Sequence, residues 1–302
     1  MEKDTVISIR DLKKSFDKKE VLKGINLSIG KGDFYGIFGK NGAGKSTLFK
    51  HILGLIRETS GEILIGGEKI SKSKLRIGYL PENIALYGNM SVVDNLKVAA
   101  MSAGGKLSKK DIAEILDKVN LTGSERVKAN DLSLGMKRRL QLAMATMTKE
   151  SDILILDEPT NGMDVNGVIW LKQYLKNLKK TGKTILICSH SLNIMEELID
   201  RYCIIIDGKI VNDEAWNYKE VQNYCYSIEL DEDKCSYNKA KQLLEEVGDI
   251  QKADDGRMNV TTKYKILPFC EILMKEEIPA LDVTVEKESL EKIFIESVGI
   301  NG

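Results

Sequence analysis

The chain has 302 residues, of which 42% are hydrophobic and 30% charged, the composition of a folded protein with about two domains. Lys plus Arg equal Asp plus Glu at 45 each, which excludes a strongly basic nucleic-acid-binding chain and a disordered one. The longest apolar runs are about four residues, whereas a membrane-spanning helix needs about 20. The first ten residues contain no signal-like apolar stretch. We therefore expect a cytosolic protein that does not cross a membrane by itself.

Cysteine and histidine usage limits the possible metal and redox chemistry. The five cysteines, at positions 188, 203, 225, 235 and 270, form no C-x-x-C pair. Cys188 and Cys203 lie in apolar runs, which favours reduced thiols in a cytosolic protein. The chain contains two histidines, too few for a His-rich metal site.

The first 210 residues alternate short apolar runs with helical patterns. Expected strands cover residues 5–9, 21–29, 34–38, 62–65, 77–80, 153–157, 184–188 and 203–206. Expected helices cover residues 45–55, 92–101, 109–119, 135–147, 165–180 and 192–200. Buried apolar strands separated by helices predict an α/β fold with a parallel sheet covered on both faces. The mostly helical stretch, about residues 85–148, indicates an inserted subdomain.

The remaining residues have a different charge and a different order of elements. Residues 1–210 carry 34 basic and 25 acidic residues, whereas residues 211–302 carry 11 and 20. This asymmetry favours domains at 1–212 and 213–302, although charged surfaces can also differ by chance. Strands are expected at 226–230, 250–253, 258–262 and 281–286, and helices at 238–247, 265–275 and 289–298. The order β-α-β-β-α-β predicts a small α+β, ferredoxin-like domain with one added helix.

A glycine-rich segment follows the strand at 34–38 and precedes a helix. Its residues are Gly39, Lys40, Asn41, Gly42, Ala43, Gly44, Lys45 and Ser46, followed by Thr47, and they fit G-x-x-x-x-G-K-[ST]. Glycines let successive backbone N–H groups converge, and a helix N-terminus adds partial positive charge. We expect a phosphate-binding loop in which Lys45 reaches the β- and γ-phosphates and the Ser46 hydroxyl ligates Mg²⁺.

A second candidate group ends the apolar strand at 153–157. Asp157 and Glu158 are adjacent carboxylates at its carboxyl end. Asp157 is expected to hold Mg²⁺ through water, and Glu158 to orient an attacking water or accept its proton. Alternatively, the two residues simply terminate a strand. His190 follows the strand at 184–188, where α/β sheets place ligand contacts, and could donate to the γ-phosphate; a single histidine is also often an ordinary surface or core residue.

Together, these segments resemble the nucleotide-binding subunit of an ABC transporter, a phosphate-loop NTPase with an inserted helical subdomain. The resemblance covers about residues 4–212. It rests on the loop at 39–47, residues 132–136 (Leu-Ser-Leu-Gly-Met), Asp157-Glu158, residues 161–164 (Asn-Gly-Met-Asp) and His190. The family usually has Leu-Ser-Gly-Gly-Gln at 132–136, so this motif is a variant.

The resemblance implies further site residues. Ser133 and Gly135 would contact the γ-phosphate bound by the opposite subunit, although Ser133 could equally be a helix cap. Phe16 would stack on adenine, or else be a core aromatic. Asp164 would lie in a loop that crosses the dimer interface. Glu82 stands where the family usually has a Gln that touches Mg²⁺, and its carboxylate adds negative charge near the γ-phosphate.

The implied function is binding and hydrolysis of ATP with Mg²⁺ to power a separate membrane permease, from the inner face of the cell membrane. Two copies would pair head to tail, without nucleic acid. The tail of about 90 residues and the variant signature resemble those of bacterial exporters, so export is the expected direction of transport. One alternative is a soluble ABC ATPase acting on ribosomes or DNA, although such proteins carry two nucleotide domains or a long coiled coil. Another is a regulatory module that binds ATP without hydrolysis, against which Glu158 and His190 argue.

Overall fold

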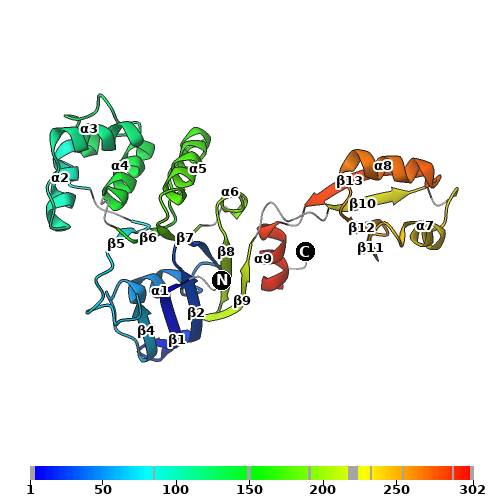
Figure 1. Cartoon of the computed structure of the whole chain (residues 1–302), viewed down its shortest axis with the longest axis horizontal. Helices are drawn as coiled ribbons and strands as arrows, with labels where there is room; N and C mark the ends of the chain where they lie inside the picture. The colour runs from blue at the N-terminus through cyan, green and yellow to red at the C-terminus, as the bar shows by residue number, and fades with distance from the viewer. Residues whose placement is uncertain are drawn as a thin grey trace. The chain divides into compact units, whose positions relative to one another are not determined.

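A computed structural model of the chain describes residues 4–83, 86–147, 151–189, 192–216, 224–231, 233–253, 255–287 and 289–299. Two compact units are formed, one by the residues up to Trp216 together with the segment that starts at Ser297, and the other by Asn217–Glu296. Figure 1 shows the elements of each unit. The first unit contains two sheets and a helical subdomain, and the second contains one sheet.

The larger sheet of the first unit has six strands. Their order is β5 (Ile77–Leu80), β6 (Ile153–Asp157), β7 (Thr184–Cys188), β3 (Phe34–Phe38), β8 (Arg201–Ile206) and β9 (Lys209–Ala215). Neighbouring strands are parallel from β5 to β8, and β9 is antiparallel to β8. Every residue of β3, β6 and β7 is buried, as expected for central parallel strands with both faces covered. The carboxyl ends of these three strands therefore lie along one edge.

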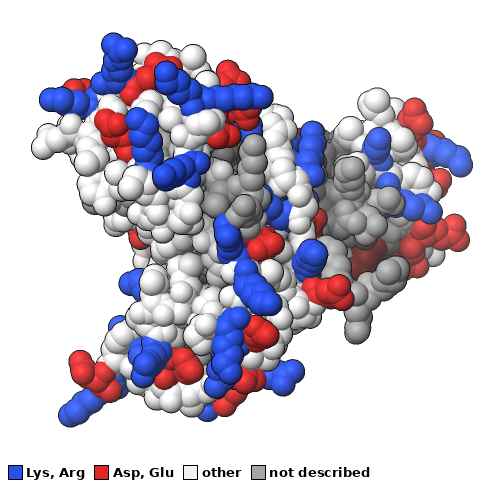
Figure 2. Space-filling view, turned by 60° about the vertical axis from the view of Figure 1, so that its left-hand side comes forward, with Lys and Arg blue, Asp and Glu red and all other residues white. Residues whose placement is uncertain are grey.

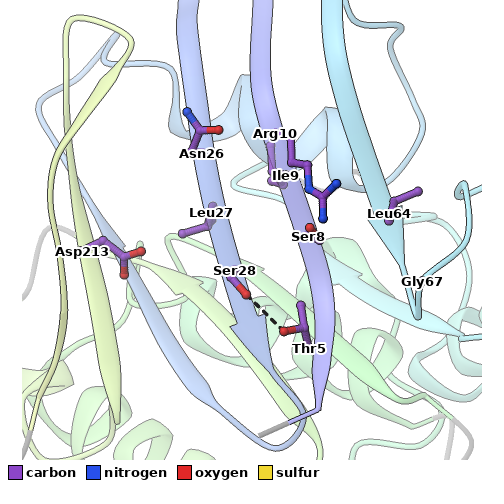
Figure 3. Close-up of a pocket in the computed structure, with 10 residues that line it drawn as sticks. All are labelled: Thr5, Ser8, Ile9, Arg10, Asn26, Leu27, Ser28, Leu64, Gly67 and Asp213. Carbon is purple, nitrogen blue, oxygen red and sulfur yellow. Dashed lines mark hydrogen bonds between the residues drawn. The ribbon is translucent and has the colours of Figure 1, made fainter. Parts of the chain in front are cut away.

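The smaller sheet of the first unit is antiparallel, in the order β2 (Lys19–Gly30), β1 (Thr5–Phe16), β4 (Ser60–Ile65). One core cluster joins this sheet to helix α1 (Lys45–Ile52) and to strands of the larger sheet. A hollow on the smaller sheet is lined by residues of β1, β2 and β4 and by Gly67 and Asp213 (Figure 3). Thr5 and Ser28, on its lining, are joined by a 3.2 Å hydroxyl hydrogen bond. None of its lining residues belongs to the predicted phosphate loop.

The inserted helical region has a core of its own. It comprises α2 (Val92–Ser102), α3 (Lys109–Lys118), a short 3₁₀ turn (Ala129–Asp131) and α4 (Leu134–Thr146). Leucine, isoleucine and valine side chains from these helices pack together, with Trp170 and Tyr174 of α5 (Val165–Lys179) against them. Ser108 and Asp111 form a reciprocal capping box at the start of α3, a kind of contact worth about 1 kcal/mol. Among the described helices, none combines the length and apolar character needed to span a bilayer.

The second unit is a four-stranded antiparallel sheet covered by two helices. Its elements follow the chain as β10 (Tyr224–Leu230), α7 (Tyr237–Leu244), β11 (Asp249–Lys252), β12 (Met258–Thr262), α8 (Ile266–Lys275) and β13 (Ala280–Lys287). The last helix, α9 (Leu290–Val298), crosses the boundary between the two units. The strands lie in the order β11-β12-β10-β13. Tyr226 stacks on Phe269 with ring centroids 4.2 Å apart, which ties the sheet to α8. Other buried side chains of β10, β12 and α7 pack in the same core.

Several elements differ in extent from the sequence expectation. The first two strands are longer, because β1 and β2 pair from Thr5 and Gly30 out to Phe16 and Lys19. The helix expected at 192–200 is the single turn α6 (Leu192–Met195), followed by turns. Strand β9 was not expected, and it crosses the boundary placed at residue 212 because it pairs with β8 as far as Ala215.

The charged side chains are mixed over the surface. On the face shown in Figure 2, Lys and Arg side chains are interspersed with Asp and Glu. Lys172 and Lys176 of α5, for example, share the carboxylate of Glu197 at 2.5 and 2.9 Å. Such half-buried surface pairs contribute about 1 kcal/mol or less each, so we assign them no functional weight.

Candidate nucleotide site of the ATP-binding unit

The glycine-rich loop joins the end of β3 to the start of α1, as its motif requires. Gly44 is the residue before the helix, and its φ of 110° is open to glycine but strained for other residues. A Cβ on Gly39 would lie 2.4 Å from the carbonyl oxygen of Ile205, so the loop also passes too close to β8 for a side chain. Gly42, in contrast, faces open space with φ at 82°. All three glycines are thus explained, Gly39 by close approach and Gly42 and Gly44 by backbone geometry.

Lys45 is held by the loop that precedes it. Its Nζ donates to the carbonyl oxygens of Gly39 at 2.7 Å and Lys40 at 3.2 Å, and the residue is 8% exposed. The following Ser46 and Thr47 are half-buried in the first turn of α1. The N-cap residue of this helix is Gly44, which has no side chain to accept hydrogen bonds from the first N–H groups. A buried cation beside uncapped backbone donors is suited to binding anionic oxygens.

The carboxylates at the end of β6 are buried. Asp157 is 2% exposed and Glu158 is 4% exposed. The Cys188 thiol at the end of β7 donates to Asp157 Oδ1 at 2.7 Å and lies 3.7 Å from Glu158 Oε1. Burial, followed by the charge of Asp157, raises the pKa of the Cys188 thiol far above its usual range, so the thiol remains a hydrogen-bond donor.

Tyr79, in the neighbouring strand β5, lies near the same carboxylates. Burial first, and then the negative charges of Asp157 and Glu82, raise the pKa of Tyr79 to about 12. Tyr79 lies in β5, which pairs with β6, so the charged Asp157 and Glu82 lie near its hydroxyl. Such charge needs a cation, and hard oxygen ligands of this type suit Mg²⁺.

The backbone at Glu158 is unusual. Its φ is +49°, in the left-handed region that a glutamate seldom adopts. Its N–H donates to the Cys188 carbonyl oxygen at 3.0 Å, and the Asn161 N–H donates back to the Glu158 carbonyl oxygen at 3.1 Å. These bonds fix the turn after β6 and hold the Glu158 side chain at the strand end.

Comparison with known proteins decides the family. A family model described as ABC transporter matches residues 22–161. The lantibiotic transport ATP-binding protein SrtF of Streptococcus pyogenes is 39% identical over 216 residues, covering 71% of this chain and 93% of SrtF. The bacitracin transport ATP-binding protein BcrA of Bacillus licheniformis is 33% identical over 305 residues, covering 98% of both. The chain belongs to the ABC transporter family.

Solved structures agree with this assignment. The dimeric structure of MJ0796, a bacterial ABC transporter cassette, has a TM-score of 0.64 and 26% identity, and it covers 70% of this chain and 99% of that chain. A structure of an ATP-binding subunit of an ABC transporter gives 0.63 and 27%, with 70% and 90% covered. The predicted fold class is therefore confirmed for the first unit, and this chain is an ATPase subunit of a membrane transporter.

The variant segment at 132–136 begins a helix in this ABC subunit. Ser133 caps α4, because its Oγ accepts the Met136 N–H at 3.3 Å, and Ser133 itself is exposed. Gly135, in the first turn, has no atom within 4 Å of an added Cβ. Leu134, in the position where the family usually has glycine, is 66% exposed and approaches Gly162. Capping of the helix does not prevent Ser133 and Gly135 from contacting a ligand, since both residues remain accessible.

The other expected residues are spread around the carboxyl edge and beyond it. Asp164 is exposed and caps α5 by accepting the Gly167 N–H at 2.7 Å. Glu82 is exposed just after β5. Phe16 is 47% exposed at the end of β1, with Lys14 Nζ 4.9 Å from its ring centre, so it is not a core aromatic. The prediction on His190 lies outside the described residues.

Two residues that contact the strand ends were not assigned a role from sequence. Sequence analysis predicted Cys188 only as a reduced thiol in an apolar run, and its position at the end of β7 was the signal that could have indicated a role. Arg138, in α4, is 4% exposed and donates to the carbonyl oxygens of Asp157 and Glu158 at 3.1 and 2.5 Å. Nothing in the sequence separates it from the neighbouring Arg139, since arginines on a helix are usually exposed.

Proposed function

We propose that the carboxyl edge of the parallel sheet binds ATP with Mg²⁺ and hydrolyses it. Residues 39–47 would wrap the phosphates, and Lys45 would exchange its carbonyl partners for phosphate oxygens. Ser46, Asp157 and Glu82 would hold Mg²⁺, because a hydroxyl and two carboxylates form a hard oxygen donor set. Glu158 would accept the proton of the attacking water, with His190 donating to the γ-phosphate.

A second copy of the chain would complete each site. In this proposal two subunits pair head to tail, and Ser133 and Gly135 of one contact the ATP bound by the other, with Asp164 in the loop at the interface. Support comes from the accessibility of these residues and from solved cassettes that are dimeric, including one bound to ADP and Pi at 25% identity. ATP would favour the closed dimer, and hydrolysis would release it.

The subunit would act through a separate transmembrane permease, which would hold it at the inner face of the cell membrane. We propose export of peptide antibiotics. Support comes from relatives named for lantibiotic transport and for bacitracin transport. A relative named for linearmycin resistance in Bacillus subtilis, 37% identical over 214 residues, supports antibiotic export more generally. The bacitracin relative aligns along 98% of the chain, so the likeness includes the C-terminal region.

We further propose two functional domains. Residues 1–212 extended through β9 would form the ATPase, with the helical subdomain at about 85–148. The residues after it would form an accessory α+β domain of ferredoxin-like order. It carries no phosphate loop and no histidine in its sequence, and so would contribute to assembly or coupling and not to chemistry.

The observation that carries this function is that a buried phosphate-loop lysine, which follows β3, and two buried carboxylates, at the end of β6, lie along the same carboxyl edge of one parallel sheet. The test is resistance in a host sensitive to bacitracin or a lantibiotic. The chain expressed with its permease should raise the inhibitory concentration, and the same pair carrying Glu158→Gln should not. Equal resistance with both would remove hydrolysis from the function, and no resistance with either would remove the substrate class.

A further inference from the structure

A single buried arginine joins three segments of the nucleotide site. Arg138 lies in the second turn of α4, and all three nitrogens of its guanidinium group donate hydrogen bonds. Nε donates to the Pro159 carbonyl at 3.3 Å, and Nη2 to the carbonyls of Asp157 and Glu158 at 3.1 and 2.5 Å. Nη1 donates to the carbonyls of Pro81 and Glu82 at 3.3 and 3.2 Å and to Gln141 Oε1 at 3.2 Å.

These carbonyls belong to two neighbouring strand ends. β5 and β6 are parallel and in register from Ile77 and Ile153 to Leu80 and Leu156, so residues 81–82 and 157–159 leave the sheet side by side. Helix α4 packs against β5, as Figure 1 also shows. The same helix begins at Ser133. One guanidinium group therefore links three segments: the Glu82 loop (residues 81–82), the Glu158 turn (residues 157–159) and helix α4, which begins after Ser133.

The contact from Arg138 acts on Glu158, whose backbone conformation is constrained. Glu158 has a left-handed backbone, its N–H is bonded to Cys188, and its carbonyl oxygen receives the 2.5 Å bond from Arg138. Burial lowers the pKa of Arg138, while the charges of Asp157, Glu158 and Glu82 oppose this shift. The cation therefore remains in a position where three carboxylates favour its charge.

We propose that Arg138 is a positioning residue that couples the Glu82 loop to the placement of the Glu158 carboxylate. Because both segments accept bonds from one rigid planar group, a displacement of the loop changes the contacts at the Glu158 turn. A lysine cannot replace it, since an ammonium is a compact point charge without the broad, fixed arrangement of donors. This inference rests on the proposed ATP hydrolysis and adds a residue that transmits movement within that site.

The test compares Arg138→Lys with Arg139→Lys. Arg139 is the adjacent residue, and its guanidinium group lies 4.8 Å from the Trp170 ring centre, outside the nucleotide site. Arg138→Lys should lower kcat at least about tenfold while KM for ATP stays within about threefold, because a small misplacement of a reacting group affects the chemical step most. Arg139→Lys should leave both within about twofold.

Hydrogen exchange supplies a measurement that a purely structural role would not move. In the wild type, Mg-ATP should alter exchange in residues 77–83 and 157–163 together. In Arg138→Lys the response of residues 39–47 should persist, while that of 77–83 should no longer follow that of 157–163. If Arg138→Lys does not fold, the kcat of Arg138→Gln and the exchange pattern of the wild type test the proposal instead.

The outcomes separate the inference from the function on which it depends. A kcat for Arg138→Lys within about twofold of wild type would overturn the positioning role. So would a wild-type protein in which 157–163 responds to Mg-ATP and 77–83 does not. A loss of ATP affinity as large as the loss of kcat would identify general collapse of the site. Absence of turnover in the wild type would instead contradict the proposed hydrolysis.

Discussion

The two units of the molecule place their charged groups differently. In the first, parallel strands deliver Asp157 and Glu158 to one edge, where they are 2% and 4% exposed. In the second, Arg257 bonds to Glu229 and Asp282 at 2.7 and 3.1 Å on an antiparallel sheet, and the two carboxylate side chains are about half exposed. Parallel strands end at a common edge, whereas antiparallel strand ends alternate. The first arrangement concentrates charge that a ligand can neutralise; the second neutralises its own.

The largest effect is expected from neutralising one carboxylate in each sheet. Glu158→Gln should lower ATP turnover at least about a hundredfold and leave ATP affinity intact, because a positioned base contributes 10²–10⁴. The ATP-bound dimer should accumulate, which size-exclusion chromatography with ATP would detect. Glu229→Gln is the matched control and should leave turnover unchanged. Near-normal hydrolysis by Glu158→Gln would mean that another group activates the water.

The next largest effect is expected from removing the ammonium group of Lys45, at the same carboxyl edge of the parallel sheet. Lys45→Ala should weaken ATP binding by about 10- to 100-fold, since a charged hydrogen bond to phosphate contributes roughly 1.5–3 kcal/mol. Lys50→Ala, on the exposed side of the same helix, should bind ATP as the wild type does. Isothermal titration calorimetry measures both. Equal affinities for the two variants would contradict a phosphate-binding role for the loop.

The smallest effect is expected from removing the second unit. A protein truncated after Trp216 should bind ATP within about threefold of the full chain, while dimer formation or coupling to the permease weakens. Truncation after Asn212 should be less stable, because it also removes Trp216, which is 7% exposed and whose Nε1 donates to the Glu196 carbonyl oxygen at 2.8 Å. Deleting a buried Trp side chain costs about 3–5 kcal/mol. Thermal melting and calorimetry separate the two, and a folded protein ending at Trp216 that cannot bind ATP would assign the tail a direct role.

The elements predicted well from sequence were those with a strong local signal. β6 and β7 are uninterrupted apolar runs, and the glycine-rich segment is followed by a helix that starts at Lys45. β9 lacked such a signal, since Lys209–Ala215 alternates weakly and is rich in polar residues; only pairing with β8 makes it a strand. The helix expected to follow residue 192 is one turn long, because tertiary contacts override local periodicity.

The candidate site could be predicted as a set of residues but not as a geometry. Sequence spacing indicated Lys45, at the start of α1, and Asp157 and Glu158, at the end of the buried strand β6. It could not indicate that Lys45 bonds to the carbonyls of Gly39 and Lys40, or that Cys188 donates to Asp157. Such contacts depend on which strands become neighbours. The order β6-β7-β3 decides this, and no local pattern encodes it.

The left-handed backbone at Glu158 has a consequence for how this protein can evolve. A residue in that conformation carries roughly 1–3 kcal/mol of strain, which glycine would relieve. Selection for thermal robustness alone would therefore favour replacing the glutamate, while selection for turnover would preserve it. Directed evolution that screens only for heat resistance should accumulate substitutions at this position and yield sturdy, inactive proteins, the expected conflict between stability and activity at a strained functional residue.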